Sequence, residues 1–228
     1  MSQLILAVKL ASRQPSASFS GQIHLVAKCS RLWTVSRIIA GAAGGIRLST
    51  LSGATTRPTT DRVREAVFST LASWLDQVDT GVDEQLAGIK FLDLYAGSGA
   101  IGCEAASRGA SEVVLVEANV AAVKICRENI GKIKLPGLRV VQVKVENYLA
   151  GEPTSQFDVI WLDPPYEMPS KALSQQIARV VAAGWLAEDG LIIVERSKRS
   201  DALDWPAELA NRWQRGYGET QLDFAQRD

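Results

Sequence analysis

The feature that most constrains the fold is a series of short apolar segments that begins at Ile89. Each segment has the length and apolar content of one buried strand, and stretches with helical spacing of apolar residues separate most of them. The five predicted strands are IKFLDLY, EVVLVE, LRVVQVKV, FDVIWLD and LIIVE. Strands that are buried on both faces and connected through helices pair in parallel. The sequence therefore predicts an α/β fold with a mostly parallel sheet.

Helical segments and a carboxyl-terminal hairpin complete this prediction. Helices are expected from the glycine turn to Arg108, over Val120–Ile130 and over Ala172–Ala183. The segment RWQRGYGETQLDFAQ has the pattern of two strands around a turn at residues 217–220. An antiparallel hairpin is therefore expected to close the parallel sheet.

Composition divides the chain into three regions. Residues 1–34 carry basic but no acidic side chains and include the serine-rich stretch SRQPSASFSG. This is typical of a transit peptide and also of an upstream frame translated in error, so we expect a disordered or artefactual leader. Residues 35–80 start with a glycine-rich β-hairpin and continue into a helix that is capped within Thr59–Asp61. Residues 81–228 form the predicted α/β domain.

Charge and residue content limit the possible functions. The 228 residues carry 25 basic and 25 acidic side chains, so any nucleic-acid contact has to come from a local patch. No apolar run is long enough to span a bilayer. The three cysteines lack metal-ligand or paired spacing, which is typical of a reducing cytosol. The single histidine, His24, lies upstream of the domain. We expect a cytoplasmic protein without a metal or a membrane partner, and nothing demands more than a monomer.

A glycine-rich turn follows the first predicted strand. GSGAIG, at Gly97–Gly102, matches G-x-G-x-x-G, in which glycine allows close approach of a nucleotide and the following helix offers unpaired N–H groups. Glu117, at the end of the next strand, is placed to accept hydrogen bonds from ribose hydroxyls. This pattern fits a nicotinamide dehydrogenase, a methyltransferase or a tight turn without a ligand. Asp93 favours the methyltransferase, because a carboxylate repels a pyrophosphate but suits the ammonium group of a methionine-like ligand.

A second motif, D-P-P-Y, follows the fourth predicted strand. Pro164 and Pro165 fix the backbone and donate no hydrogen bond, so the bend presents carbonyl acceptors at the carboxyl edge of the sheet. Asp163 and the carbonyl of Pro164 can accept both protons of a nucleobase amine and orient it. Tyr166 offers a flat face for an extruded base, and such stacking contributes roughly 1–3 kcal/mol. The alternative is a rigid turn in which Tyr166 covers the surface.

Together these motifs resemble a known family. DLYAGSGAIGCEAASRGA, LDPPY, GWL and VE, in this order, resemble class I S-adenosylmethionine-dependent methyltransferases that act on exocyclic amines. RIIAGAAGGIRL and TRPTTDRVREAVF narrow the likeness to the RsmD-type 16S ribosomal RNA guanine-N2-methyltransferases, from about Arg37 to the end. The resemblance implies a seven-stranded Rossmann-like sheet with an antiparallel last strand. It also implies methylation of one guanosine in 16S ribosomal RNA or in the assembling small ribosomal subunit.

The resemblance also assigns site residues by position. Asp163–Tyr166 correspond to the catalytic motif that holds the target base. Many relatives have Asp or Asn after the third strand, near the adenine amine of the cofactor, where this chain has Lys144 and Val145. The backbone of Val145 can still meet the adenine ring, and Glu146 is an alternative acceptor. The predicted residues that bind S-adenosylmethionine are Asp93, Tyr95, Gly97, Gly99, Glu117, Ala118 and Val145.

A local group of arginines supplies the basic patch that a neutral RNA-binding protein needs. The glycine-rich hairpin and the following helix contain few acidic residues to oppose them. The alternatives are a solvated helix face with arginines paired to Asp61 or Glu65, and a role for Arg62 in closing the cofactor pocket. The predicted RNA-binding residues are Arg37, Arg47, Arg57, Arg62 and Arg64.

Other functions remain open from the residues alone. The acceptors of D-P-P-Y can orient the exocyclic amine of any nucleobase. An adenine-N6 or cytosine-N4 methyltransferase on DNA or RNA is therefore the nearest alternative. The glycine spacing by itself also fits a nicotinamide-dependent oxidoreductase. A non-catalytic RNA-binding module that keeps the fold is a third possibility.

Overall fold

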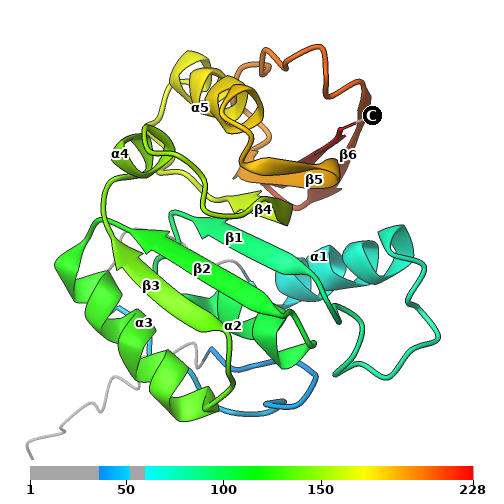
Figure 1. The fold of residues 1–228 in the computed structure, drawn as a ribbon, viewed down its shortest axis with the longest axis vertical. Helices are drawn as coiled ribbons and strands as arrows, with labels where there is room; N and C mark the ends of the chain where they lie inside the picture. Colours follow the sequence, from blue (N-terminus) through cyan, green and yellow to red (C-terminus); the bar gives the residue numbers. More distant parts are fainter. Residues whose placement is uncertain (1–35, 52–59, 228) are drawn as a thin grey trace, which may run out of the picture. The chain divides into compact units, whose positions relative to one another are not determined.

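The structure is a computed structural model that describes residues 36–51 and 60–227 (Figure 1). The described residues fall within one compact unit. The predicted leader, residues 1–34, and Arg57 lie outside the described residues, and what was predicted for them stays a prediction. The elements in chain order are α1 (Asp61–Trp74), β1 (Lys90–Leu94), α2 (Ala100–Ser107), β2 (Glu112–Glu117), α3 (Val120–Ile133), β3 (Leu138–Gln142), α4 (Val145–Leu149), β4 (Phe157–Leu162), α5 (Ser170–Ala182), β5 (Leu186–Ser197), β6 (Asn211–Tyr217) and β7 (Thr220–Gln226).

The strands form one seven-stranded sheet in the order β3-β2-β1-β4-β5-β7-β6. Strands β1 to β5 pair in parallel. The last strand, β7, is inserted antiparallel between β5 and β6. The β6–β7 connection lies at the turn predicted for residues 217–220. The predicted α/β sheet, mostly parallel with an antiparallel last strand, is confirmed.

Helices cover both faces of this sheet (Figure 1). On one face, Phe68 of α1 and Ile101 of α2 belong to a core cluster that includes Trp161 of β4. On the other face, α4 and α5 contribute Leu149 and Ile177 to a second cluster. The parallel strands are therefore buried on both sides, which requires apolar residues at consecutive positions. None of the described helices is long and apolar enough to cross a membrane.

Helix α1 begins where its cap was predicted. The Thr60 hydroxyl accepts a hydrogen bond from the backbone N–H of Val63 at 3.3 Å, which satisfies one of the unpaired N–H groups at a helix start. Val63, Val67 and Leu71 follow at helical spacing and are buried. Amphipathic spacing thus fixes the face of α1 that packs on the sheet.

Residues 36–51 contain the predicted short hairpin, which docks on α2. The backbone N–H of Ile38 donates to the carbonyl of Ile46 at 2.9 Å, and that of Leu48 donates to the carbonyl of Ser36 at 2.8 Å. A single β-bridge joins Arg37 to Arg47. The buried carboxylate of Glu104 in α2 accepts hydrogen bonds from two backbone N–H groups of this segment, at 2.7 and 3.1 Å. The hydroxyl of Ser107 donates to a carbonyl of the segment at 2.5 Å and accepts a backbone N–H at 2.9 Å. Side chains of α2 therefore hold this short hairpin in place.

The third strand is shorter than predicted. LRVVQVKV was expected to be extended throughout, but β3 ends at Gln142 and Val145 begins the five-residue helix α4. The prediction is wrong at this end because Val143 and Val145 flank a polar residue, and this alternation is typical of a strand. In the structure Val145 is 3 % exposed and packs in the same cluster as Leu149 of α4.

Candidate functional site

The two sequence motifs meet at the carboxyl ends of neighbouring parallel strands. The glycine turn follows β1, and the D-P-P-Y bend follows β4, which pairs with β1. The register aligns Leu94 with Val116 and with Leu162, so these strand ends are level. The backbone N–H of Asp163 donates to the carbonyl of Leu94 at 3.4 Å. Ligand sites in open α/β sheets lie at this edge, where the predicted cofactor and catalytic residues come together.

The glycine turn depends on backbone conformations that favour glycine. Gly97 and Gly99 have φ angles of +55° and +75°, in the left-handed region. A Cβ atom at Gly99 would also lie 3.0 Å from Leu115 Cδ1 and 3.2 Å from Cys126 Sγ. At Gly97 the nearest atom to such a Cβ is the Tyr95 carbonyl oxygen, 4.0 Å away. The backbone at Gly97 is therefore open to close approach, whereas Gly99 is required for packing.

Glu117 is fixed against this turn. One of its carboxylate oxygens accepts the backbone N–H of Gly97 at 2.8 Å, and the other accepts that of Asn119 at 2.7 Å. Each carboxylate oxygen has two lone pairs, so acceptor capacity remains for a ligand. Ala118, the next residue, is exposed. The end of β2 thus presents an oriented carboxylate beside the glycine turn.

Asp93 lies beneath the turn, with 1 % of its surface exposed. Its carboxyl group accepts a hydrogen bond from the backbone N–H of Gly102 at 3.1 Å. Burial raises the pKa of Asp93 to about 8, the Gly102 hydrogen bond opposes this shift, and the charge of Glu117 adds to it. Asp93 therefore holds the first turn of α2 against β1, a positioning contact that the sequence did not predict.

Tyr95 begins a polar network that sequence reasoning missed. Its hydroxyl donates to the side-chain oxygen of Gln176 in α5 at 2.6 Å, and Gln176 donates to Glu146 in α4 at 3.0 Å. Burial raises the pKa of Tyr95 to about 12. The network links the glycine turn to the start of α4, next to the buried Val145. Only contact between distant elements reveals it, because Gln176 lies within an ordinary amphipathic helix pattern.

The D-P-P-Y bend is partly anchored and partly exposed. Pro164 is buried, whereas Pro165 and Tyr166 are exposed. The backbone N–H of Met168 donates to the carbonyl of Pro165 at 2.9 Å, which closes the bend. With 54 % of its surface exposed, the Tyr166 side chain has the accessible face that a stacking residue requires.

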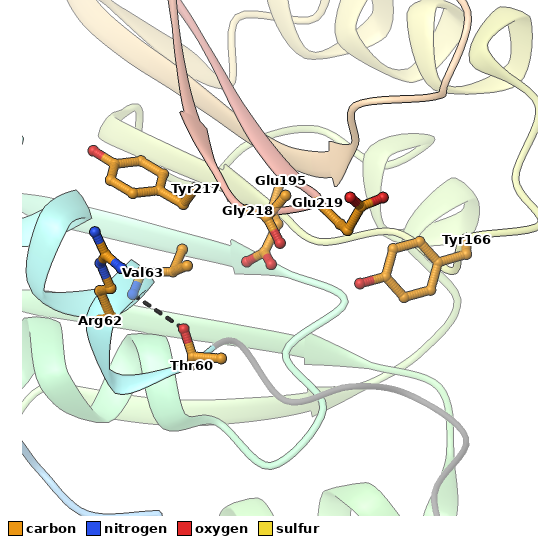
Figure 2. A pocket seen from close by; sticks show the side chains of 9 residues that line it. Thr60, Arg62, Val63, Tyr166, Glu195, Tyr217, Gly218 and Glu219 are labelled. Atoms are coloured by element: carbon orange, nitrogen blue, oxygen red, sulfur yellow. Dashed lines mark hydrogen bonds between the residues drawn. The ribbon is translucent and has the colours of Figure 1, made fainter.

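A cavity of about 280 Å³ lies beside the bend (Figure 2). The start of α1, the end of β5 and the β6–β7 turn enclose it together with Tyr166. The sequence marked Glu195 only as part of VE, without a role, and gave no indication that the carboxyl-terminal turn joins the site. The lining residues are Thr60, Arg62, Val63, Tyr166, Glu195, Tyr217, Gly218, Glu219 and Thr220.

The predicted arginine patch is only partly accessible. Arg37, Arg47 and Arg62 are exposed. Arg64 is completely buried, and its guanidinium donates to the carbonyl of Arg37 at 2.8 Å and to Asp61 at 2.6 Å. The prediction that Arg64 contacts RNA is wrong, because the side chain instead joins α1 to the preceding segment. No group of three or more potential metal ligands occurs among the residues that the structure describes.

Known proteins share both the sequence and this architecture. The family model "Conserved hypothetical protein 95" matches residues 36–226. Ribosomal RNA small subunit methyltransferase D of Escherichia coli strain K12 is 32 % identical over 216 residues, which cover 95 % of this chain and 96 % of that protein.

Solved structures agree with this match. "Putative methyltransferase yhhF from Escherichia coli" has a TM-score of 0.70 at 30 % identity and covers 84 % of this chain and 97 % of its own. A hypothetical protein of Thermus thermophilus has a TM-score of 0.65 at 34 % identity, with 83 % and 98 % covered. The chain therefore belongs to the conserved hypothetical protein 95 family, the RsmD-type methyltransferase family that its motifs resemble.

Proposed function

We propose that this protein transfers a methyl group from S-adenosylmethionine to the exocyclic N2 of a guanosine in small-subunit (16S) ribosomal RNA. One observation carries the proposal: the glycine turn and the D-P-P-Y bend meet at level strand ends, joined by the hydrogen bond from Asp163 to Leu94. The relative named ribosomal RNA small subunit methyltransferase D supports the RNA class.

The residues at the turn fit S-adenosylmethionine, which when bound supplies a methyl group on a positively charged sulfur. The backbone of Gly97 is open, and Glu117, held by two backbone N–H groups, has lone pairs left for ribose hydroxyls. Asp93 places a carboxyl group directly below the turn, where a cationic ligand would favour its ionised form. We assign the remaining contacts of this site to Tyr95, Gly99, Ala118 and Val145.

The D-P-P-Y bend is assigned to the target base. The amine nitrogen of guanine is a poor nucleophile because its lone pair is delocalised into the ring. Asp163 and the carbonyl of Pro164 accept hydrogen bonds from its two N–H groups, which orients the amine. These contacts also stabilise the positive charge that grows on the nitrogen as the new carbon–nitrogen bond forms and the methyl–sulfur bond breaks, with the electron pair left on sulfur. The nitrogen then loses one proton to Asp163 or water. Pro165 keeps the bend rigid, and the accessible ring of Tyr166 stacks on the base.

RNA contact outside the base is assigned to the exposed arginines. Arg37 and Arg47 face each other across the β-bridge of the segment docked on α2, and Arg62 lines the cavity beside Tyr166. Arg57 was predicted to join them and lies outside the described residues. Because the net charge of the chain is zero, such local cations would supply the attraction for phosphates.

Substitution of Asp163 tests the assignment. We expect Asp163→Ala to lower methyl transfer from labelled S-adenosylmethionine to small-subunit RNA by at least about 100-fold, the order expected when a preorganised polar group is removed. Calorimetric binding of S-adenosylhomocysteine should stay within about threefold of wild type, because Asp163 contacts the base. Glu167→Ala, a change of an exposed carboxylate next to the motif, should leave both values unchanged. Undiminished transfer by Asp163→Ala, or a wild-type protein that binds NAD instead of S-adenosylhomocysteine, would contradict the proposal.

A further inference from the structure

We propose that Glu195 selects guanine by accepting a hydrogen bond from its N1–H group, an inference that rests on the proposed function. Glu195 belongs to β5, is 4 % exposed and lines the cavity that also contains Tyr166. A carboxylate has about four lone-pair sites, so it can accept a ligand donor in addition to contacts within the protein. A nucleobase with an N–H group next to its reactive amine supplies such a donor.

The sheet register places Glu195 next to Asp163. Leu162 of β4 pairs with Val194 of β5 in parallel, so Asp163 and Glu195 follow at matching positions. Neighbouring strands lie about 4.8 Å apart, and side chains alternate between the two faces. Asp163 and Glu195 are therefore expected on the face that carries the buried side chain of Trp161. The carboxyl edge thus offers two adjacent acceptor groups from two adjacent strands.

The cavity has the size and walls for one flat ring. Its volume of about 280 Å³ is just below the range of about 300 to 1,000 Å³ that is usual for small-molecule sites. Figure 2 shows Glu195 between the rings of Tyr166 and Tyr217. Tyr166 follows β4, Tyr217 is the last residue of β6, and Arg62 of α1 lies at the same cavity. A single base fits this enclosure better than a whole nucleoside cofactor.

Base chemistry then decides which base is accepted. In guanine the exocyclic N2 and the ring N1 are bonded to the same carbon. The base therefore offers two amine protons and, beside them, the N1 proton. In adenine and cytosine the ring nitrogen next to the exocyclic amine has a lone pair and no proton. A second carboxylate beside Asp163 would attract guanine N1–H and repel that lone pair. Two adjacent acceptors therefore fit guanine and disfavour the other two amine-bearing bases.

A paired-substrate experiment isolates this contact. The wild-type protein is given small-subunit RNA with either guanosine or 2,6-diaminopurine riboside at the methylated position. Both bases have the N2 amine, but the ring N1 of diaminopurine carries a lone pair instead of a proton. Because one good hydrogen-bonded base contact discriminates by about 1–3 kcal/mol, wild type should prefer guanosine in kcat/KM by at least about fivefold. Equal use of both substrates overturns the inference without any variant.

Two variants distinguish recognition from a structural role. Glu195→Gln keeps the shape but adds an N–H donor that can meet the lone pair of diaminopurine, so the guanosine preference should fall to about one or reverse. Glu219→Gln changes another carboxylate at the same cavity, one that is exposed and paired with Arg199 at 3.1 Å, and should keep the wild-type preference. Thermal unfolding of each variant reports whether it is folded.

The outcomes separate the two proposals. If Glu195→Gln slows both substrates equally and leaves the preference unchanged, Glu195 is structural and only this inference fails. If wild type methylates no guanosine at N2, the proposed function fails and the inference fails with it. If Glu195→Gln does not fold, the wild-type preference between the two substrates still decides.

Discussion

At the scale of single residues, the site contains a carboxyl group whose ionisation opposes folding. Asp93 is buried beneath the glycine turn, and burial raises its pKa from 3.8 to about 8. The unfolded chain releases this proton near pH 4, whereas the folded protein keeps it to about pH 8. Between these values the folded state binds the extra proton, so this group makes the free energy of unfolding fall as pH rises. The slope reaches at most about 1.4 kcal/mol per pH unit.

Asp93→Asn should remove this dependence. The amide oxygen can still accept the Gly102 N–H, but the side chain does not ionise. We expect the stability of the variant relative to wild type to improve between pH 5 and pH 9. Urea unfolding of both proteins at the two pH values measures this difference. A relative stability that does not change with pH would show that Asp93 does not titrate in this range.

At the scale of elements, α2 follows the glycine turn and also holds a second part of the chain. Glu104 and Ser107 hold the segment 36–51 through backbone hydrogen bonds. Gly41 makes the close approach possible, because its φ is +84° and an added Cβ would overlap the carbonyl of Ser107. Glu104 and Ser107 therefore position the segment that carries Arg37 and Arg47.

Two glycine substitutions measure this docking. Gly41→Ala and Gly45→Ala both place a side chain at positive φ, +84° and +83°, but Gly45 has no atom within 4 Å of its added Cβ. The backbone penalty of about 1–2 kcal/mol is common to both. We expect Gly41→Ala to lower the free energy of unfolding by about 1–3 kcal/mol more, the typical cost of overpacking. Chemical denaturation gives the two values, and equal losses would mean that the contact with Ser107 yields without cost.

The elements could be predicted from sequence to different degrees. β2 was predicted with its observed bounds, because the four apolar residues of EVVLVE are uninterrupted and a glutamate marks each end. The α1 cap was predicted within Thr59–Asp61 from the helical spacing that follows, and the structure places it at Thr60. Helix α4 was missed because five residues are too few to show a helical period. The short hairpin predicted before α1 is confirmed, with an antiparallel bridge between Arg37 and Arg47. Its docking on α2 was missed, because local sequence does not show hydrogen bonds between distant segments.

At the scale of the whole molecule, the site is assembled from distant parts of the chain. The two motifs were predicted to lie at one edge because parallel strands bring their carboxyl ends together. The cavity was not predicted, since it also needs the β6–β7 turn and the start of α1. The same limit applies to Glu195, whose place beside Asp163 follows from strand order and register. Arg64 was predicted to be accessible for a similar reason: its local sequence is basic, but tertiary contacts bury it.

The central claim, N2 methylation of a guanosine in small-subunit RNA, is tested most directly by mass analysis of nucleosides. Small-subunit RNA, free and in partly assembled subunits, is incubated with the protein and methyl-labelled S-adenosylmethionine, then digested and mapped. The account predicts label in N2-methylguanosine at a single position in at least one of these substrates. Label in N6-methyladenosine or N4-methylcytidine, or no label in either substrate, would contradict it.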